Sequence, residues 1–150
     1  MTTGRPPLRI RVIVIGLVWN EGRLLAAEVT DDTGMVRGVR PLGGGIEFGE
    51  TREQALRREF SEELGVAIDI ISPWQVIENI FEQQGQVGHE IVFAAEVTLA
   101  DRSFHARHTI TFAEDDLSSW TARWFDPADL ARRGIALYPP GLLELFRARD

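Results

Sequence analysis

Residues 44–66 read GGIEFGETREQALRREFSEELGV, a glycine-rich stretch that continues into a helical pattern. Within that pattern Leu56, Phe60 and Leu64 recur at every fourth position, with Ala55 beside them. This spacing places apolar side chains on one face of a helix. The segment therefore predicts a helix that packs one face against a core, preceded by a loop with little side-chain bulk.

The ends of this helix are marked by local signals in the sequence. Thr51 is followed three positions later by Gln54, the spacing of a capping box, in which each side chain bonds to the backbone of the other residue. Gly65 stands where helices commonly end, because glycine adopts the left-handed conformation required there without steric cost. We expect the helix to span Thr51 to Leu64.

Three carboxylates lie on one side of the predicted helix. Glu59, Glu62 and Glu63 are spaced i, i+3 and i+4, so they project within one turn of each other. Like charges at this spacing repel, whereas Mg²⁺ or Mn²⁺, which prefer oxygen ligands, would turn the repulsion into a coordination shell. On its own, such a run of acids is more often a solvated helix face.

The glycines that precede the helix change this interpretation. Gly43, Gly44 and Gly45 let the backbone approach a ligand closely, and free amides at a helix start favour anionic groups. A stretch suited to phosphate therefore adjoins a face suited to divalent metal. Together they predict a site where metal ions and a phosphorylated ligand meet.

The same segment resembles the Nudix box, G-x5-E-x7-R-E-U-x-E-E-x-G-U, where U is a bulky apolar residue. Every defined position is met, by Gly44, Glu50, Arg58, Glu59, Phe60, Glu62, Glu63, Gly65 and Val66. Weaker similarities to the family are an early hairpin, residues 41–45 leading into the box, residues 89–90 opening a later strand, and residues 124–126 before the C-terminal helices. The resemblance therefore covers most of the chain.

This resemblance implies a fold and a reaction. The fold is an α/β (α+β) sandwich of the Nudix type, with αβα layers around a mixed β-sheet, a catalytic loop and helix, and a C-terminal helix. The reaction is Mg²⁺-dependent hydrolysis of a phosphoric anhydride (pyrophosphate) bond in a nucleoside diphosphate linked to another group, by a metal-activated water. A covalent route has little support, because the chain has no cysteine and no serine in a recognisable nucleophile elbow.

Roles for individual residues follow from the resemblance as well. The expected metal ligands are three helix carboxylates and one backbone carbonyl: Glu59, Glu62, Glu63 and Gly43. Glu59 would also activate or orient the water. Glu50 and Arg58 would pair to hold the loop against the helix, but an i,i+4 ion pair between Arg58 and Glu62 is an equally open interpretation.

A further acid from outside the box is expected, since many members of the family use one as metal ligand or base. Glu114 is the first choice because it opens an acidic loop between two predicted strands. Asp115 and Asp116 follow it, and Glu90 is a separate candidate. The alternative is that this loop is simply solvated.

Histidine and aromatic residues leave further interpretations open. His89 would either contact phosphate or base, or be a structural histidine with its own hydrogen bond. We expect most large aromatic side chains in the core, although stacking of one of them on a nucleobase would be favourable. The candidates are Trp19, Trp74, Phe81, Trp120 and Trp124.

Composition limits the class of protein. The chain has 150 residues, 44% of them apolar, which suits one domain over residues 1–150. Without cysteine it has no disulfide and no zinc-thiolate site. Residues 12–19 form an apolar run too short to span a bilayer, and its β-branched content predicts a buried strand rather than a signal peptide. We expect a cytoplasmic protein without a membrane partner.

The net charge of −7 bears on partners and substrates. It argues against nucleic acid, whereas metal held by carboxylates admits a small phosphorylated substrate. The expected partner is a nucleotide, and a homodimer is left open. Oxidised or ordinary nucleoside triphosphates, nucleoside diphosphates and nucleotide sugars all remain candidates, because specificity lies on loops outside the box. Two alternatives are a nucleotide-sensing module without hydrolysis and an enzyme acting on capped RNA.

The remaining segments alternate strands with turns. Asp126 and Pro127 predict the cap and first residue of a short helix through Leu130, and Tyr138-Pro139-Pro140 predicts the start of a last helix. The expected strands span residues 8–19, 23–29, 39–42, 67–81 with a break at 72–73, 89–99, 108–112 and 121–125.

Overall fold

Two curled mixed sheets form the body of the protein in the computed structural model, which describes residues 5–113 and 119–147. The first sheet has the order β5 (Gly43–Gly45), β1 (Ile10–Leu17), β8 (Gln86–Leu99) and β6 (Ile68–Ile70), and β7 (Gln75–Gln83) also pairs with β8. β1 and β8 run parallel, and the other pairs of this sheet are antiparallel. β1 is central because consecutive residues, Ile13, Val14 and Ile15, are buried on both of its faces.

The second sheet has the order β11 (Ala136–Leu137), β4 (Val36–Pro41), β3 (Arg23–Thr30), β10 (Ser119–Phe125) and β9 (Thr109–Ala113), with β2 (Trp19–Asn20) on β3. The turn between β2 and β3 was expected from its glycine. Glu21 and Gly22 both have positive φ, at 51° and 79°, the conformation that closes a tight hairpin.

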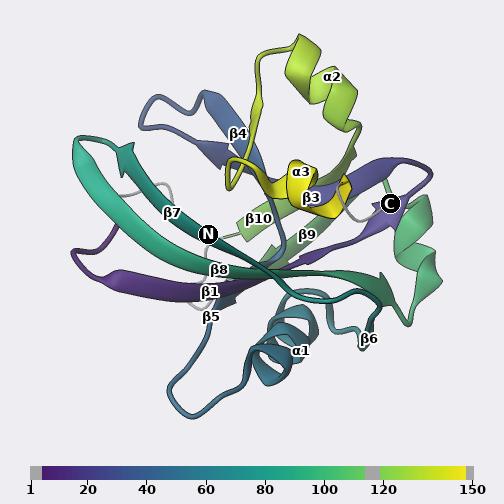
Figure 1. Ribbon diagram of the computed structural model, residues 1–150. Helices are drawn as coiled ribbons and strands as arrows, with labels where there is room; N and C mark the ends of the chain where they lie inside the picture. Colours follow the sequence, from purple (N-terminus) through teal and green to yellow (C-terminus); the bar gives the residue numbers. More distant parts are fainter. Residues whose placement is uncertain (1–4, 114–118, 148–150) are drawn as a thin grey trace.

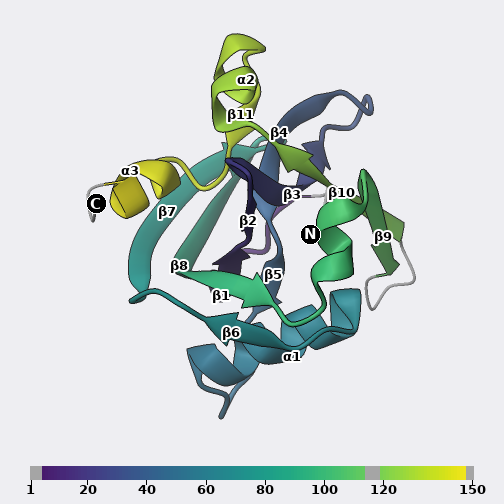
Figure 2. The same cartoon turned by 90° about the vertical axis from the view of Figure 1, so that its right-hand side faces the viewer.

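Helices lie on both sides of the sheets (Figure 1). α1 (Arg52–Leu64) lies below the first sheet in this view, whereas α2 (Pro127–Arg132) and α3 (Leu142–Arg147) lie above it. Figure 2 shows the same layers from the side, with α1 beneath β6 and β1. A short 3-10 turn, η1 (Arg102–Ala106), follows β8. The predicted αβα arrangement around mixed β structure is confirmed.

The predicted ends and core face of α1 are also confirmed. The Gln54 amide donates to the Thr51 hydroxyl at 3.1 Å, and the Thr51 amide donates to the Gln54 side chain at 2.9 Å, which completes the capping box. Gly65 ends the helix in the left-handed conformation, with φ of 65°. Phe60 is fully buried and packs where Gly16 leaves room, since a Cβ there would lie 2.8 Å from its ring.

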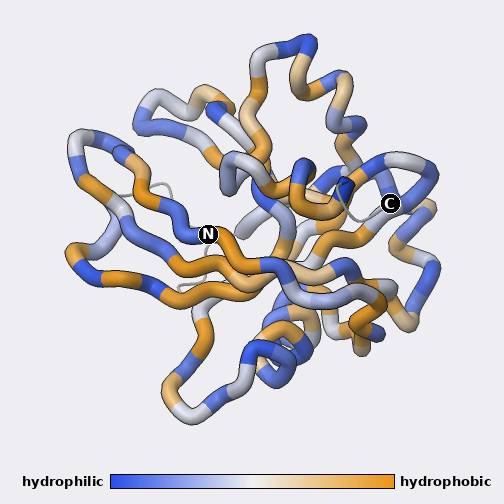
Figure 3. Tube along the Cα trace, viewed as in Figure 1, coloured by the Kyte–Doolittle hydropathy of each residue, from blue (hydrophilic) through white to orange (hydrophobic). Residues whose placement is uncertain are grey.

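Apolar side chains fill the space between the layers. Figure 3 shows hydrophobic segments along the strands that cross the middle of the molecule and hydrophilic segments at the turns. One cluster lies between α1 and the sheets and includes Val14, Leu42, Leu56, Phe60 and Val97. Another joins the first sheet to α3 and includes Ile13, Ile15, Val92, Leu142 and Phe146. The two clusters hold the first sheet from both sides.

Some boundaries differ from the sequence predictions. Gly43–Gly45, expected as a loop, forms a short strand because it pairs with β1. β8 begins at Gln86 rather than at His89, because the tight turn falls at Gln84 and Gly85, both with positive φ. The last helix begins at Leu142 rather than at Tyr138, after Gly141 with φ of 86°. Among the described residues, no helix is long and apolar enough to cross a membrane.

Candidate active site

Arg58 ties the segment before α1 to the helix itself. Its Nε and Nη2 atoms donate to the two carboxylate oxygens of Glu50 at 2.7 and 2.9 Å. Nη2 also donates to the Gly45 carbonyl at 2.9 Å, and Nη1 donates to Glu59 at 2.9 Å. The hydrogen bonds to Glu50 raise the pKa of Arg58 and lower the pKa of Glu50. One guanidinium thus fixes strand β5, the loop and the helix carboxylate relative to one another.

Glu59 and Glu63 form a buried pair on the inner side of α1. The Glu59 side chain is 12% exposed, and both carboxylate oxygens of Glu63 are buried. Burial raises the pKa of Glu59, against the opposing effect of hydrogen bonds to Glu63 and Arg58. The sequence pattern placed these glutamates off the core stripe, whereas Glu63 is 9% exposed and lies at its edge.

The glycines of β5 permit a close approach to this pair. A Cβ at Gly44 would lie 2.5 Å from the carboxyl carbon of Glu59, so no other residue fits there without moving that carboxylate. Gly43 has φ of 156°, and a Cβ on it would overlap the Val14 carbonyl. The structure thus requires glycine at both positions for contacts within the protein, and the predicted approach of the backbone to a ligand stays a prediction.

Glu62, the third predicted metal ligand, shares Arg58 Nη1 with Glu59 but is not buried with Glu59 and Glu63. Its carboxylate is half-exposed and lies 3.3 Å from Arg58 Nη1. Within residues 5–113 and 119–147, no three acidic or histidine side chains converge as a ready-made metal cluster. The physical reason is that three carboxylates repel without a cation, so that Glu62 is better placed on the guanidinium.

The donors nevertheless fit a hard divalent cation. All of them are oxygens, as Mg²⁺ and Mn²⁺ prefer. The buried pair of Glu59 and Glu63 marks a place where a cation would relieve the repulsion between carboxylates. Glu62 is about one helical turn from Glu59 and directly precedes Glu63. Its rotation away from Arg58 would complete the predicted set of carboxylates.

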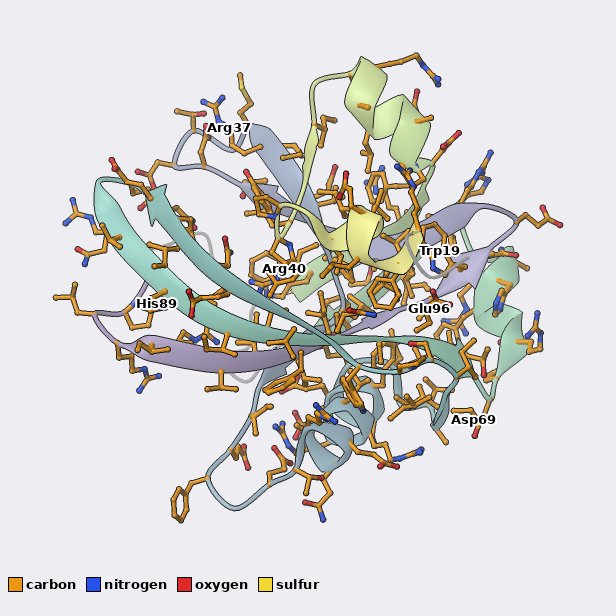
Figure 4. The ribbon with its side chains drawn as sticks, in the orientation of Figure 1. Trp19, Arg37, Arg40, Asp69, His89 and Glu96 are labelled. Atoms are coloured by element: carbon orange, nitrogen blue, oxygen red, sulfur yellow. The ribbon has the colours of Figure 1, made fainter. Side chains whose placement is uncertain are left out.

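A cavity of about 450 Å³ opens on β5, and Glu59, Glu62 and Glu63 are not among the residues that line it. Gly43 and Gly44 line it together with residues of β1, β4, β7 and β8. Glu90 lies in this cavity and is 4% exposed, with Arg40 at 3.1 Å and Arg11 at 3.7 Å. Figure 4 shows Arg40 in the space between β8 and the second sheet. The structure thus places Glu90 in an ion-paired cluster and not beside Glu59.

The other predicted site residues have different outcomes. Glu114, Asp115 and Asp116 lie outside the described residues. His89 does not line the cavity, because successive residues of β8 point to opposite faces and Glu90 points into it. The Nε2 atom of His89 is buried and has no hydrogen-bond partner in the described part of the chain. Four aromatic residues pack against the core as expected, namely Trp19, Trp74, Trp120 and Trp124, whereas Phe81 lines the cavity.

Comparison with known proteins assigns the chain to a family. The model of the NUDIX domain matches residues 7–146, nearly the whole chain. The chain belongs to the Nudix hydrolase family. Several residues that met the Nudix box lie around Arg58 and Glu59 in the structure, namely Gly44, Glu50, Glu62 and Glu63. The family membership predicted from the Nudix box is confirmed.

Individual relatives of this Nudix chain are more distant. The nucleoside triphosphatase NudI of Escherichia coli is 43% identical over 76 residues, covering 49% of this chain and 54% of NudI. The chain spans about half the length of the curated relatives it matches. The E. coli ORF135 protein has a TM-score of 0.59 and 23% identity, covering 93% of this chain and 90% of its own. A NUDIX hydrolase from Nitrosomonas europaea has a TM-score of 0.59 and 18% identity, covering 93% and 87%. These structures confirm the fold.

Most residues that line the cavity were not predicted from the sequence as site residues, among them Arg11, Arg40, Asn79 and Tyr138. A signal for two of them was available, because Arg11 and Arg40 each interrupt an apolar strand pattern. A charge within a buried strand needs a partner. Which partner it finds depends on strand pairing, and the sequence pattern does not show that pairing.

Proposed function

We propose that this Nudix protein hydrolyses a phosphoric anhydride bond in a nucleoside diphosphate linked to another group, with Mg²⁺ or Mn²⁺ as cofactor. The observation that carries the proposal is the buried pair Glu59 and Glu63, packed against Gly44 at the edge of the cavity. Burying two carboxylates so close to each other costs free energy unless a proton or a cation offsets their charge. A cation there would face a ligand that lies along β5.

The residues that would hold the cation are Glu59, Glu62, Glu63 and the carbonyl of Gly43. When bound, Mg²⁺ would supply an activated water and offset charge on the pyrophosphate oxygens. Glu59 would accept a proton from the attacking water or orient it, at a carboxylate that Arg58 Nη1 holds in place. Arg58 and Glu50 keep β5 against the helix, so a phosphate on the glycine strand stays aligned with Glu59.

Similarity to a relative favours one class among the candidate substrates. NudI is named a nucleoside triphosphatase, and the shared half of the two chains favours nucleoside triphosphates among the candidate substrates. Nucleoside diphosphates and nucleotide sugars remain candidate substrates and are included in the assay below. Cytoplasmic location, a single domain and a homodimer remain predictions.

A panel of nucleotides, assayed for release of phosphate, pyrophosphate and monophosphate with Mg²⁺ and with chelator, tests the proposal. We expect release that needs metal and that falls by orders of magnitude in Glu59→Gln. Glu53→Gln is the matched control, because Glu53 lies on the same helix, is 58% exposed and forms an ion pair with Arg57 on the outer side of the helix. Binding of nucleotide without product would instead support a sensing module, and unchanged turnover in Glu59→Gln would overturn the assignment of the site.

A further inference from the structure

A row of polar side chains crosses the cavity floor. The strand register sets Arg11 of β1 beside Glu90 of β8, and Glu90 beside Asn79 of β7. Residues paired in this way point to the same face of a sheet, and all three line the cavity. The next row on this face is wholly apolar, formed by Ile13, Val92 and Ile77. The polar row is therefore a local feature of an otherwise apolar floor.

Arg40 reaches this row from the opposite sheet. Its Nη2 donates to Glu90 Oε1 at 3.1 Å, while Arg11 Nη1 lies 3.7 Å from Glu90 Oε2. The side chains of Arg40 and Glu90 are only 17% and 6% exposed. Two guanidinium groups thus share one carboxylate, which leaves an excess positive charge. Burial lowers the pKa of Arg40 against the favourable effect of Glu90, so this cation is held at a cost.

The charges at the mouth of the cavity do not cancel this excess. Asp31 pairs with Arg37 at 2.7 Å in the β3–β4 turn, so these two charges offset each other. Glu82 is exposed and lies three residues beyond Asn79 on β7. The inner end of the cavity is therefore its positive part, within a chain whose net charge is −7.

Strand β5 separates this positive end from the catalytic carboxylates. A Cβ at Gly44 would lie against the Glu59 carboxylate, whereas the atom nearest to a Cβ at Gly45 would be Arg11 Nη2, at 3.9 Å. Neighbouring residues of a strand point to opposite faces. A ligand lying along the backbone of β5 is thus within reach of both groups. The planar guanidinium fork suits phosphate oxygens, and its remaining N–H groups need acceptors.

We propose that Arg11 and Arg40, held in place by Glu90, form an anion subsite that binds a phosphate group of the nucleotide. The apolar side chains of Phe81, Tyr138 and Ile15, which also line the cavity, then bound the space for the base and sugar. Arg11 and Arg40 contact the ligand, and Glu90 is a positioning residue. The identification of the bound anion as part of a nucleotide rests on the proposed function. Anion binding itself needs no hydrolysis and does not depend on that function.

The test measures binding of inorganic phosphate and pyrophosphate by calorimetry, with metal chelated, in the intact protein. We expect Arg11→Met and Arg40→Met to weaken binding about tenfold or more, because each loses charge-assisted hydrogen bonds. The control is Arg132→Gln, which removes one positive charge from a surface pair on α2 that does not line the cavity. With Mg²⁺ and a nucleotide substrate, the same Met variants should raise KM much more than they lower kcat.

Arg40→Lys separates folding from binding, because lysine keeps a cation for Glu90 but loses the fork. We expect it to fold like the wild type and to bind pyrophosphate several-fold more weakly. Wild-type affinity in Arg40→Lys, or in both Met variants, would show that the arginines only link the two sheets and would overturn the subsite. Hydrolysis of nucleotides by a protein that binds neither phosphate nor pyrophosphate would also overturn the subsite. That result would leave the proposed function intact. Arginine-dependent anion binding without hydrolysis supports the subsite and counts against the proposed function.

Discussion

Arg58 holds Glu50 through two parallel hydrogen bonds, Nε to Oε2 at 2.7 Å and Nη2 to Oε1 at 2.9 Å. The i,i+4 contact with Glu62 also exists, but its shortest distance is 3.3 Å, and it involves only Nη1. Arg58 thus makes both contacts that the sequence left open, the pair with Glu50 and the i,i+4 pair with Glu62. The shorter, two-pronged pair is the one that fixes the loop before α1, and a fork of this kind constrains direction as well as distance.

Arg58→Lys should therefore impair catalysis more than stability. Lysine keeps the charge but cannot bond both oxygens of Glu50 and the Gly45 carbonyl at once. We expect unfolding free energy to fall by about 1–2 kcal/mol and kcat to fall by about 100-fold, as a misplaced carboxylate would cause. Urea unfolding and steady-state kinetics measure the two effects.

Arg57→Lys is the control for this change. Arg57 is the preceding helix residue and bonds to Glu53 and to the Ile68 carbonyl, away from Glu59. Arg57→Lys should lower the free energy of unfolding by a similar amount and leave kcat nearly normal. Equal kcat in the two variants would mean that the fork on Glu50 does not position the site.

Gly44→Ala and Gly45→Ala should differ sharply although they are neighbours. A methyl group at Gly44 must displace the Glu59 carboxylate, which is the end of a flexible side chain, so the fold should tolerate it. At Gly45 the methyl group would meet only Arg11 Nη2, at an ordinary contact distance of 3.9 Å. We expect about a 100-fold loss of kcat in Gly44→Ala and a small change in Gly45→Ala. Comparable kinetics for the two variants would contradict the proposed contact between β5 and Glu59.

The parts of the fold that local sequence determines were predictable. The capping box at Thr51 and Gln54, the glycine that ends α1 and the buried face with Leu56 and Phe60 depend on residues a few positions apart. The box itself gave the glutamates, Arg58 and the family. The helix predictions are confirmed because helix geometry relates sequence spacing directly to spatial position, whereas the roles of the glutamates stay predictions.

The cavity was not predictable in the same way. Arg11, Arg40 and Glu90 meet only because β1 pairs in parallel with β8 and because the second sheet brings β4 across them. Their separations along the chain carry no periodic signal. The inward position of Glu63 was missed for a related reason, since it depends on how α1 is rotated against the sheets rather than on the apolar stripe.

Addition of Mg²⁺ should raise the melting temperature of the wild type, because a ligand that binds the native state stabilises it. The carboxylates of Glu59 and Glu63 are the groups expected to bind it, so Glu63→Gln should reduce the shift. Without metal, Glu59→Gln should melt no lower than the wild type, since burial disfavours the charged form of Glu59. Melting scans with chelator and with millimolar Mg²⁺ check both points. An equal Mg²⁺ shift in wild type and Glu63→Gln would place the metal elsewhere.

Asp31 should make stability depend on pH through the β3–β4 turn. Its Oδ1 accepts bonds from the Thr33 hydroxyl at 2.6 Å, the Thr33 amide at 2.9 Å and the Met35 amide at 3.1 Å, and Arg37 donates to Oδ2 at 2.7 Å. These bonds, the Thr33 hydroxyl first, lower the pKa of Asp31 from 3.8 to about 2. A carboxyl group whose pKa is lowered on folding stabilises the protein above its unfolded pKa. Asp31→Asn should therefore be less stable than the wild type at neutral pH.

That stability difference should be complete well above a pH of 3.8, should fall as the pH drops from 3.8 towards 2, and should vanish below a pH of about 2, where the carboxyl group is protonated in both folded and unfolded protein. Urea unfolding of both proteins along this pH range gives the difference, and an NMR titration of the Asp31 carboxyl carbon gives the midpoint directly. Asp32→Asn is the matched control, because Asp32 is the next residue in the turn and is exposed. A midpoint near 3.8, or a difference that persists unchanged at the acid end, would show that the turn does not stabilise the charged form of Asp31.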